Sequence, residues 1–182
     1  MTKLNQKDSL VLIIDIQEKL LNAVFNKTTL EKKAQIMAGI TKILAIPTVV
    51  TEQYPKGLGA TVASVKTSLA DDAKFFEKTS FSALKNEELL DAIKKLNKKQ
   101  IIIFGIETHI CVSQTTTALI EAGYDVSVIK DACGSRSEEE YSAGLARMKE
   151  NGAHIITTEI ALFEWLEGAK HPNFKEVQSL IK

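Results

Sequence analysis

Short apolar runs alternate along the chain with longer stretches in which apolar residues recur every three or four positions. Runs of four to eight residues are typical of buried strands, and the three-to-four spacing is typical of amphipathic helices. The runs predict strands at Ser9–Ile14, Pro47–Thr51, Lys74–Lys78, Ile101–Phe104, Asp125–Ile129 and His154–Thr157. The periodic stretches predict helices at Thr29–Leu44, Asn86–Leu96, Thr108–Ala122, Glu138–Glu150, Ala161–Leu166 and Phe174–Ile181.

This alternation of strands and helices is typical of βαβ units, which build a parallel sheet covered by helices on both faces. We therefore expect a single α/β domain over residues 1–182, a length that suits one core. Residues 1–7 precede the first strand and are expected to form a loose arm. The long irregular region Glu52–Asp72 is expected to form part of a site rim or an interface.

Composition narrows the class of function. Lys plus Arg and Asp plus Glu number 23 each, so the formal net charge is zero, whereas nucleic-acid and anionic-membrane binders need a basic surface. No apolar stretch approaches the length of a membrane span, and the first apolar run ends at Asp15 without the features of a signal peptide. The two cysteines, Cys111 and Cys133, have neither disulfide-framework nor zinc-site spacing. We expect a cytoplasmic protein with reduced thiols and no nucleic-acid or membrane partner.

The strand Ile101–Phe104 runs directly into a cysteine-bearing helix. Gly105 interrupts the strand, and Thr108 is placed to cap a helix whose first turn carries Cys111. The first turn of a helix presents unpaired N–H groups and the positive end of the dipole, which favour a thiolate and can stabilise an oxyanion. Cys111 is therefore a candidate nucleophile, and the alternative is a small buried apolar residue.

Three reactive side chains follow or end predicted strands. Asp15 follows the first strand, Lys78 ends the third, and Cys111 begins the helix after the fourth. Because ligands of parallel α/β sheets bind beyond the carboxyl ends of the strands, these side chains share one edge. A base, a cation and a nucleophile are the groups that acyl transfer through a thioester needs. Taken singly, they could be a helix cap, a solvated strand end and a core thiol.

Five segments of the chain, in this order, resemble the isochorismatase-like cysteine hydrolases, a family that includes nicotinamidases and N-carbamoylsarcosine amidohydrolase. The resemblance covers nearly the whole chain and is closest to the isochorismatase domain-containing branch. With it, we predict a three-layer α/β/α fold with a six-stranded parallel sheet in the order 3-2-1-4-5-6. It also implies a homodimer or larger homo-oligomer, with the region Glu52–Asp72 near the interface. The segments are Leu12–Gln17, Thr51–Gly59, Glu77–Ser82, Gly105–Val112 and Asp131–Arg136.

The resemblance implies a catalytic triad of Asp15, Lys78 and Cys111. Asp15 would take the proton of the Cys111 thiol and later deliver it to the leaving amine. Lys78 would hold Asp15 ionised and stabilise the thiolate. Backbone N–H groups of Glu107 and Cys111 would form the oxyanion hole, and a cis peptide bond would join Ile106 to Glu107.

Two departures from the family shape the expected activity. Isochorismatases that cleave an enol ether carry glycine at the position of Cys111, so the thiol favours hydrolysis of a C–N bond. Nicotinamidases bind a divalent metal through an Asp-x-His motif where this chain has Glu52, Gln53 and Tyr54, and we therefore expect no metal and no cofactor.

We predict metal-independent hydrolysis of a small amide or ureido compound. The alternatives are a binding or scaffold protein and a thiol redox sensor on the same fold. Cys133 could serve such a sensor as a resolving thiol, although a small pocket-wall residue is the favoured interpretation. The candidate pocket walls are Gln17, Tyr54, Phe81 and Cys133.

Overall fold

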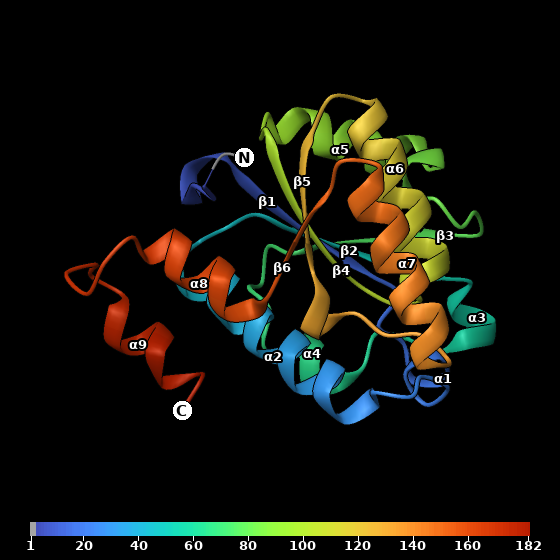
Figure 1. Cartoon of the computed structure of the whole chain (residues 1–182), viewed down its shortest axis with the longest axis horizontal. Helices are drawn as coiled ribbons and strands as arrows, with labels where there is room; N and C mark the ends of the chain where they lie inside the picture. Colours follow the sequence, from blue (N-terminus) through green and yellow to red (C-terminus); the bar gives the residue numbers. More distant parts are fainter. Residues whose placement is uncertain (1–2) are drawn as a thin grey trace.

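Six parallel strands form one sheet in the computed structural model, which describes residues 3–182 (Figure 1). The order across the sheet is β3-β2-β1-β4-β5-β6, and every neighbouring pair is parallel. This confirms the predicted fold and strand order. The strands are β1 (Ser9–Ile14), β2 (Thr48–Gln53), β3 (Lys74–Lys78), β4 (Gln100–Gly105), β5 (Asp125–Ile129) and β6 (His154–Ile156).

Helices cover both faces of the sheet. The α-helices are α1 (Glu18–Leu21), α2 (Lys27–Ile43), α3 (Pro55–Leu58), α4 (Ala63–Lys66), α5 (Glu87–Leu96), α6 (Ser113–Glu121), α7 (Glu138–Glu150), α8 (Thr158–Leu166) and α9 (Phe174–Ser179). Helix α2 packs against α4, α8 and α9, whereas α6 packs against α7, which separates two helical layers (Figure 1). Residues 3–182 also contain three short 3₁₀ helices, η1 (Gln6–Asp8), η2 (Ala83–Lys85) and η4 (Lys130–Ala132), and one π-helical turn, η3 (Thr108–Val112).

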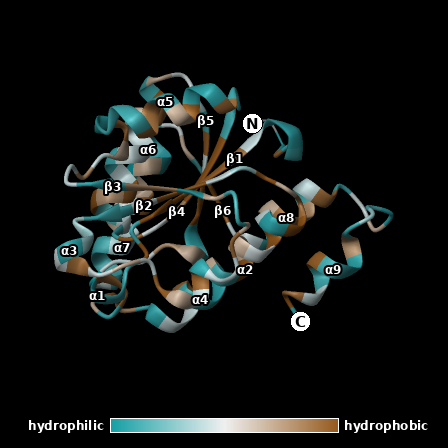
Figure 2. Cartoon of the chain, turned by 180° about the vertical axis from the view of Figure 1, so that it is seen from behind, coloured by the Kyte–Doolittle hydropathy of each residue, from teal (hydrophilic) through white to brown (hydrophobic). Residues whose placement is uncertain are grey.

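The central strands β1 and β4 carry the core. Every residue of both strands is buried, and apolar colour marks the strands that cross the middle of the molecule (Figure 2). Because helices cover both faces of the sheet, the sequences of these strands are continuous apolar runs and do not alternate between apolar and polar residues. The edge strand β3 is mostly exposed, and only its last residue, Lys78, is buried.

Local sequence signals explain the helix boundaries. Helix α7 spans the predicted residues, and the side chain of Ser137 accepts a hydrogen bond from the Glu140 N–H at its start. Helix α8 begins at Thr158, three residues before the predicted start, because Thr157 caps it by accepting from the Ile160 N–H.

Two expectations about irregular segments are corrected. The region Glu52–Asp72 contains the end of β2 and two short helices, α3 and α4, the first of which begins at Pro55. The N-terminal arm is not loose from Leu4 onward, because Leu4 is buried and its N–H donates to the Glu164 carboxylate at 2.8 Å. Residues 1 and 2 lie outside the described residues.

Within residues 3–182, the structure contains no helix that is both long enough and apolar enough to span a membrane.

Candidate active site

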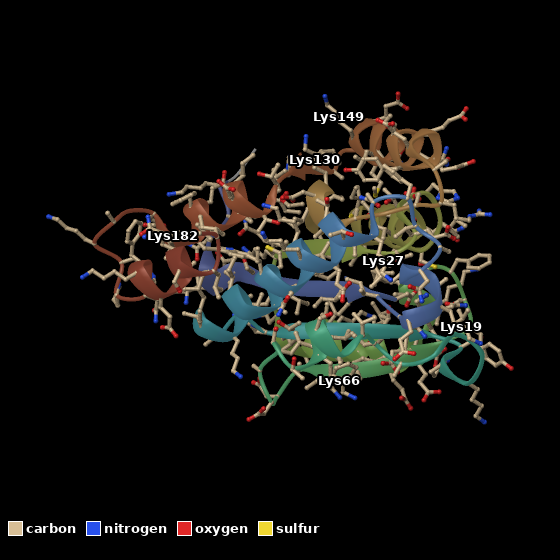
Figure 3. All side chains as sticks on the ribbon, turned by 90° about the horizontal axis from the view of Figure 1, so that it is seen from below. Lys19, Lys27, Lys66, Lys130, Lys149 and Lys182 are labelled. Carbon is tan, nitrogen blue, oxygen red and sulfur yellow. The ribbon has the colours of Figure 1, made fainter. Side chains whose placement is uncertain are left out.

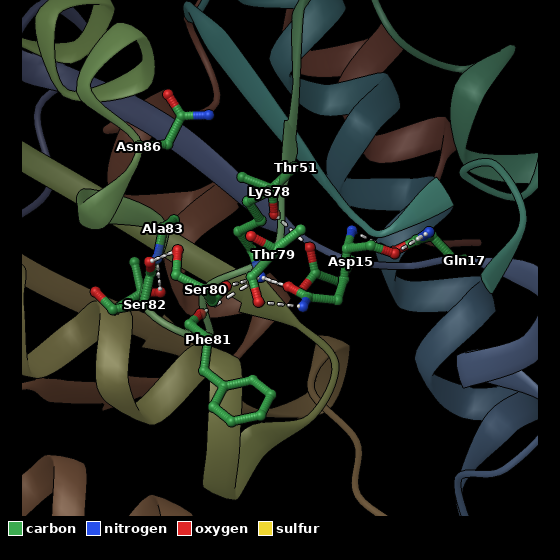
Figure 4. A network of polar contacts seen from close by, with 12 residues as sticks. Asp15, Gln17, Thr51, Lys78, Thr79, Ser80, Phe81, Ser82, Ala83 and Asn86 are labelled. Atoms are coloured by element: carbon green, nitrogen blue, oxygen red, sulfur yellow. Dashed lines mark hydrogen bonds and ion pairs between the residues drawn. The ribbon is translucent and has the colours of Figure 1, made fainter. Parts of the chain in front are cut away.

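The parallel register places Asp15 and Lys78 together at the carboxyl edge of the sheet. In that register, Ile14 lies beside Thr51 and Gln53 lies beside Lys78, so the ends of β1, β2 and β3 are adjacent. Asp15 follows β1 with a positive φ of 50°, a conformation uncommon for residues other than glycine. The Nζ atom of Lys78 lies 2.6 Å from Oδ2 of Asp15, and the two side chains are 1% and 0% exposed (Figure 4).

Two residues of β2 hold this ion pair, and neither is among the site residues predicted from the sequence. The Thr51 hydroxyl donates to Oδ1 of Asp15 at 2.6 Å, and Oε1 of Gln53 accepts from Nζ of Lys78 at 2.6 Å. Thr51 and Gln53 are two positions apart, so their side chains leave the strand on the same face. Polar residues with this spacing at the carboxyl end of an apolar strand were the signal that could have found them.

The segment that carries Cys111 differs from the predicted helix start. The N–H groups of Ile110 and Val112 both donate to the carbonyl oxygen of Glu107, which widens the first turn into the π-helical η3 before α6 begins. Thr108 therefore lies inside the turn and does not cap it, and its hydroxyl is buried without a hydrogen-bond partner in the described structure. The predicted cap is wrong, although the cysteine does sit at the start of the helical segment.

The structure brings the Cys111 thiol to the buried ion pair but does not make it acidic. The pKa of Cys111 is raised to about 12: burial is the largest cause, the negative charge of Asp15 also raises it, and the positive charge of Lys78 lowers it. The expectation that the helix start would favour the thiolate is therefore wrong, because the loss of hydration outweighs the nearby cation. With its pKa raised in this way, Cys111 is a neutral thiol beside Asp15.

The second thiol is also buried, which predicts a loss of stability at alkaline pH. Burial raises the pKa of Cys133 to about 12, as for Cys111, and raises that of Tyr141 to about 12. An unfolded thiol titrates near 9.0, so the unfolded chain releases protons that the folded chain still holds. Stability that is fully present below about pH 9 is therefore lost as the pH rises toward about 12.

We expect the urea midpoint of the wild-type protein to fall between about pH 8 and about pH 10.5, and to fall less in a Cys133→Ala variant. Both proteins are compared with their own midpoint at about pH 8, so any cost of the smaller side chain cancels. Parallel pH dependences of the two proteins would contradict a neutral, buried Cys133.

The turn between β4 and η3 is fastened on both sides. Gly105 has a φ of 137°, and a Cβ atom there would lie 2.0 Å from the Ile14 carbonyl oxygen, so the backbones meet where only glycine fits. The Ile106 N–H donates to that same oxygen at 2.9 Å, and the Thr108 N–H donates to the Gly134 carbonyl at 2.9 Å. The peptide bond between Ile106 and Glu107 is cis.

The four candidate pocket walls occupy different surroundings. Tyr54 lines a cavity of about 550 Å³ that Lys78 and Ser80 also line. Phe81 is 54% exposed, and its ring points away from the ion-pair network (Figure 4). Gln17 is fully buried, and its side-chain amide bonds the backbone of residues 53 and 59, so it supports the loop and does not face an open pocket. Cys133 is fully buried as well.

The residues at the position of the nicotinamidase metal motif are used internally. Oε1 of Glu52 accepts from both the N–H and the hydroxyl of Thr61, each at 2.7 Å. Across residues 3–182, no group of three or more His, Cys, Asp or Glu side chains is arranged to hold a metal ion.

Basic side chains are spread around the molecule (Figure 3). The labelled examples, which lie on different sides of it, are Lys19, Lys27, Lys66, Lys130, Lys149 and Lys182. This distribution agrees with the balance of 23 basic and 23 acidic residues.

Solved structures similar to this chain share its whole fold. MAR1 ribonuclease from Caenorhabditis elegans has a TM-score of 0.95 at 38% identity, covering 99% of this chain and 92% of that one. YcaC from Pseudomonas aeruginosa, solved with hexane-2,5-diol and covalent acrylamide, has a TM-score of 0.92 at 27% identity, covering 98% and 91%. YcaC from Escherichia coli, described as an octameric hydrolase of unknown specificity, has a TM-score of 0.89 at 26% identity, covering 98% and 96%.

Curated relatives align over almost the full length of the chain. Isochorismatase domain-containing protein 2 of Xenopus laevis is 41% identical over 181 residues, which cover 98% of this chain and 86% of the relative. Isochorismatase family protein 1A of Dictyostelium discoideum is 40% identical over 181 residues, covering 97% and 87%. The sequence pattern of the isochorismatase domain itself matches residues 9–160. With the pattern matched from the first strand into α8, the chain belongs to the isochorismatase-like hydrolase family.

Proposed function

We propose that this protein is a metal-independent cysteine hydrolase that cleaves a C–N bond of a small amide or ureido compound through a thioester. The observation that carries the proposal is the buried Asp15–Lys78 ion pair, whose two charges both act on the Cys111 thiol. Removing two charges from water costs several kcal/mol per ion, so a buried ion pair contributes little net free energy to folding. A base and a cation beside a nucleophile are what acyl transfer requires.

The first half of the reaction forms the thioester. As Sγ of Cys111 attacks the substrate carbonyl carbon, Asp15 takes the thiol proton and the carbonyl π electrons move onto oxygen. The N–H groups of Glu107 and Cys111 stabilise the resulting oxyanion, and Lys78 keeps a positive charge beside the reacting groups. When the C–N bond breaks, Asp15 returns its proton to the leaving amine.

The second half releases the acid. Water attacks the thioester carbon while Asp15 takes one of the water protons, and the C–S bond then breaks. The electron pair of that bond returns to Cys111, which regains its proton from Asp15. The products are a carboxylic acid from an amide, or a carbamic acid from a ureido compound.

The named relatives bear on this proposal in different ways. The covalent acrylamide of the Pseudomonas aeruginosa protein supports a reactive nucleophile in the family. The Caenorhabditis elegans structure is named as a ribonuclease, whose reaction differs from the C–N bond hydrolysis proposed for this chain. Zero net charge and dispersed lysines favour a small-molecule substrate for this chain over a nucleic acid.

Self-association is also part of the proposal. The octameric Escherichia coli relative supports a homo-oligomer, and Phe25, Tyr54 and Phe81 expose about half of their surfaces, from 48% to 55%. Exposed aromatic side chains are enriched at protein interfaces. The cytoplasmic location stays a prediction.

An activated ester tests the nucleophile before any substrate is known. After brief exposure to 4-nitrophenyl acetate, peptide mapping should find an acetyl group on Cys111, removable by neutral hydroxylamine as a thioester is. Cys133 serves as the internal comparator and should remain unmodified, because it is fully buried. An unmodified Cys111, or equal acetylation of both cysteines, would contradict the proposal.

A further inference from the structure

We propose that Gln53 is a positioning residue that fixes the Lys78 ammonium against Asp15. This inference deepens the proposed function and rests on it. Gln53 does not act on the substrate in this account; it acts through Lys78.

The Lys78 ammonium is held by hydrogen bonds to side chains and to the backbone. An ammonium has three N–H donors, and four oxygen atoms surround this one: Oδ2 of Asp15 and Oε1 of Gln53, both at 2.6 Å, and the carbonyls of Ser80 at 3.2 Å and Phe81 at 3.4 Å. The two short bonds go to side chains, and the two longer ones share the third proton. Gln53 and Asp15 therefore set the position of the charge.

The orientation of the Gln53 amide is fixed by its other end. Its Nε2 donates to the Thr79 carbonyl at 2.8 Å, so rotation of the amide would break this bond and place a donor against the Lys78 ammonium. A glutamine held in this way presents only its oxygen to the cation.

The backbone of Gln53 is fixed as well. Its N–H donates to Oε1 of Gln17 at 2.7 Å, and its carbonyl accepts from Nε2 of Gln17 at 3.0 Å. The same Nε2 donates to the Gly59 carbonyl at 2.6 Å, which ties the arrangement to the loop after α3. The acceptor for Lys78 is thus built on a strand end that is itself anchored.

Two residues of β2 each hold one partner of the ion pair. Thr51 holds Oδ1 of Asp15, and Gln53 holds Nζ of Lys78, so the end of β2 sets both partners. Without the Gln53 oxygen, the ammonium loses one acceptor and is expected to move toward the Ser80 and Phe81 carbonyls, which already contact it. Movement in that direction weakens its hold on Asp15, and the carboxylate then takes up a proton more readily.

The test uses Gln53→Met, which keeps the length of the side chain and removes both its acceptor and its donor. The rate of Cys111 acetylation by 4-nitrophenyl acetate is measured across pH. We expect the rate to fall about tenfold, as for loss of one hydrogen bond to a charged group. The acid limb of the profile, which reports protonation of the base, should move to higher pH.

Gln100→Met is the matched control. Gln100 is buried, whereas Gln53 is half-buried, and the Gln100 side chain bonds two backbone groups, the Asn5 N–H at 2.8 Å and the Lys3 carbonyl at 3.1 Å, at the amino-terminal end of β4. Its substitution should cost stability and leave the acetylation rate and the acid limb unchanged. A general loss of folded protein would lower the amount of acetylated protein in both variants. It would not move the acid limb of the pH–rate profile in either.

A second variant, Gln53→Glu, decides the matter if Gln53→Met does not fold. It keeps an oxygen for Lys78 but adds a negative charge beside the ion pair, so the acid limb should again move to higher pH. Folded Gln53 variants with the wild-type limb would overturn this inference and leave the proposed function standing. A wild-type protein that is not acetylated at Cys111 would overturn the proposed function, and this inference with it.

Discussion

Substitution of Cys111 by serine is expected to lower the rate of acyl transfer by about a thousandfold or more. A hydroxyl is a far weaker acid than a thiol, so Asp15 cannot remove its proton at a comparable rate. Serine is close in size to cysteine, and Cys111 is only 6% exposed within a fixed turn, so the fold should persist. The residual rate would come from the oxyanion hole and from binding alone.

The measurement is amine release from a panel of small amides and ureido compounds, together with 4-nitrophenolate release from the activated ester. Cys133→Ser is the matched control, because it replaces the other buried thiol and should keep the rate within about threefold. Turnover that survives in Cys111→Ser, or an equal loss in Cys133→Ser, would refute the assignment of the nucleophile. RNA cleavage that is insensitive to Cys111→Ser would indicate a separate activity.

The grouping of Asp15, Lys78 and Cys111 could be predicted from the sequence because it depends on topology. Apolar runs identify the strands, and each of the three residues lies at the carboxyl end of one of them. In a parallel sheet those ends meet at one edge, whatever the details of packing. The structure accordingly places the Asp15–Lys78 ion pair close enough to the Cys111 thiol for both charges to act on its pKa.

The protonation of the thiol could not be predicted in the same way. A cysteine near a helix start is expected to be acidic when solvent reaches it. Here the carbonyl of Glu107 takes two N–H groups and forms the wide turn that carries Cys111, and the surrounding core removes the thiol from water. The burial depends on contacts between distant segments, which the local sequence pattern does not encode.

The residues that hold the ion pair were not predicted from the sequence, for a related reason. The sequence makes Gln17 a candidate pocket wall, but its amide bonds the backbone of Gln53 and Gly59. Whether an amide at a strand end contacts a ligand or a neighbouring loop depends on the path of that loop. Polar residues at an active edge can therefore be found by pattern, while their partners require the structure.

Replacement of Lys78 by methionine is expected to lower the free energy of unfolding by roughly 3–5 kcal/mol. The change leaves the Asp15 carboxylate fully buried without its cation, although the Thr51 hydroxyl still donates to it. An uncompensated buried charge is costly, whereas methionine fills much of the volume of the lysine stem. Urea unfolding at neutral pH measures the difference. Lys33→Met, which removes a longer and more exposed ion pair with Asp131, should cost less than about 1 kcal/mol.

The double variant Asp15→Asn/Lys78→Met separates charge from packing. Because neither partner is then charged, its stability should lie much closer to that of the wild type than the stability of Lys78→Met does. A double variant as unstable as Lys78→Met would mean that the cost arises from lost packing and not from the unpaired carboxylate. A double variant that regains stability but is still not acetylated at Cys111 would support a role of the ion pair in the reaction. The fold would then form without the ion pair, whereas the reaction would still require it.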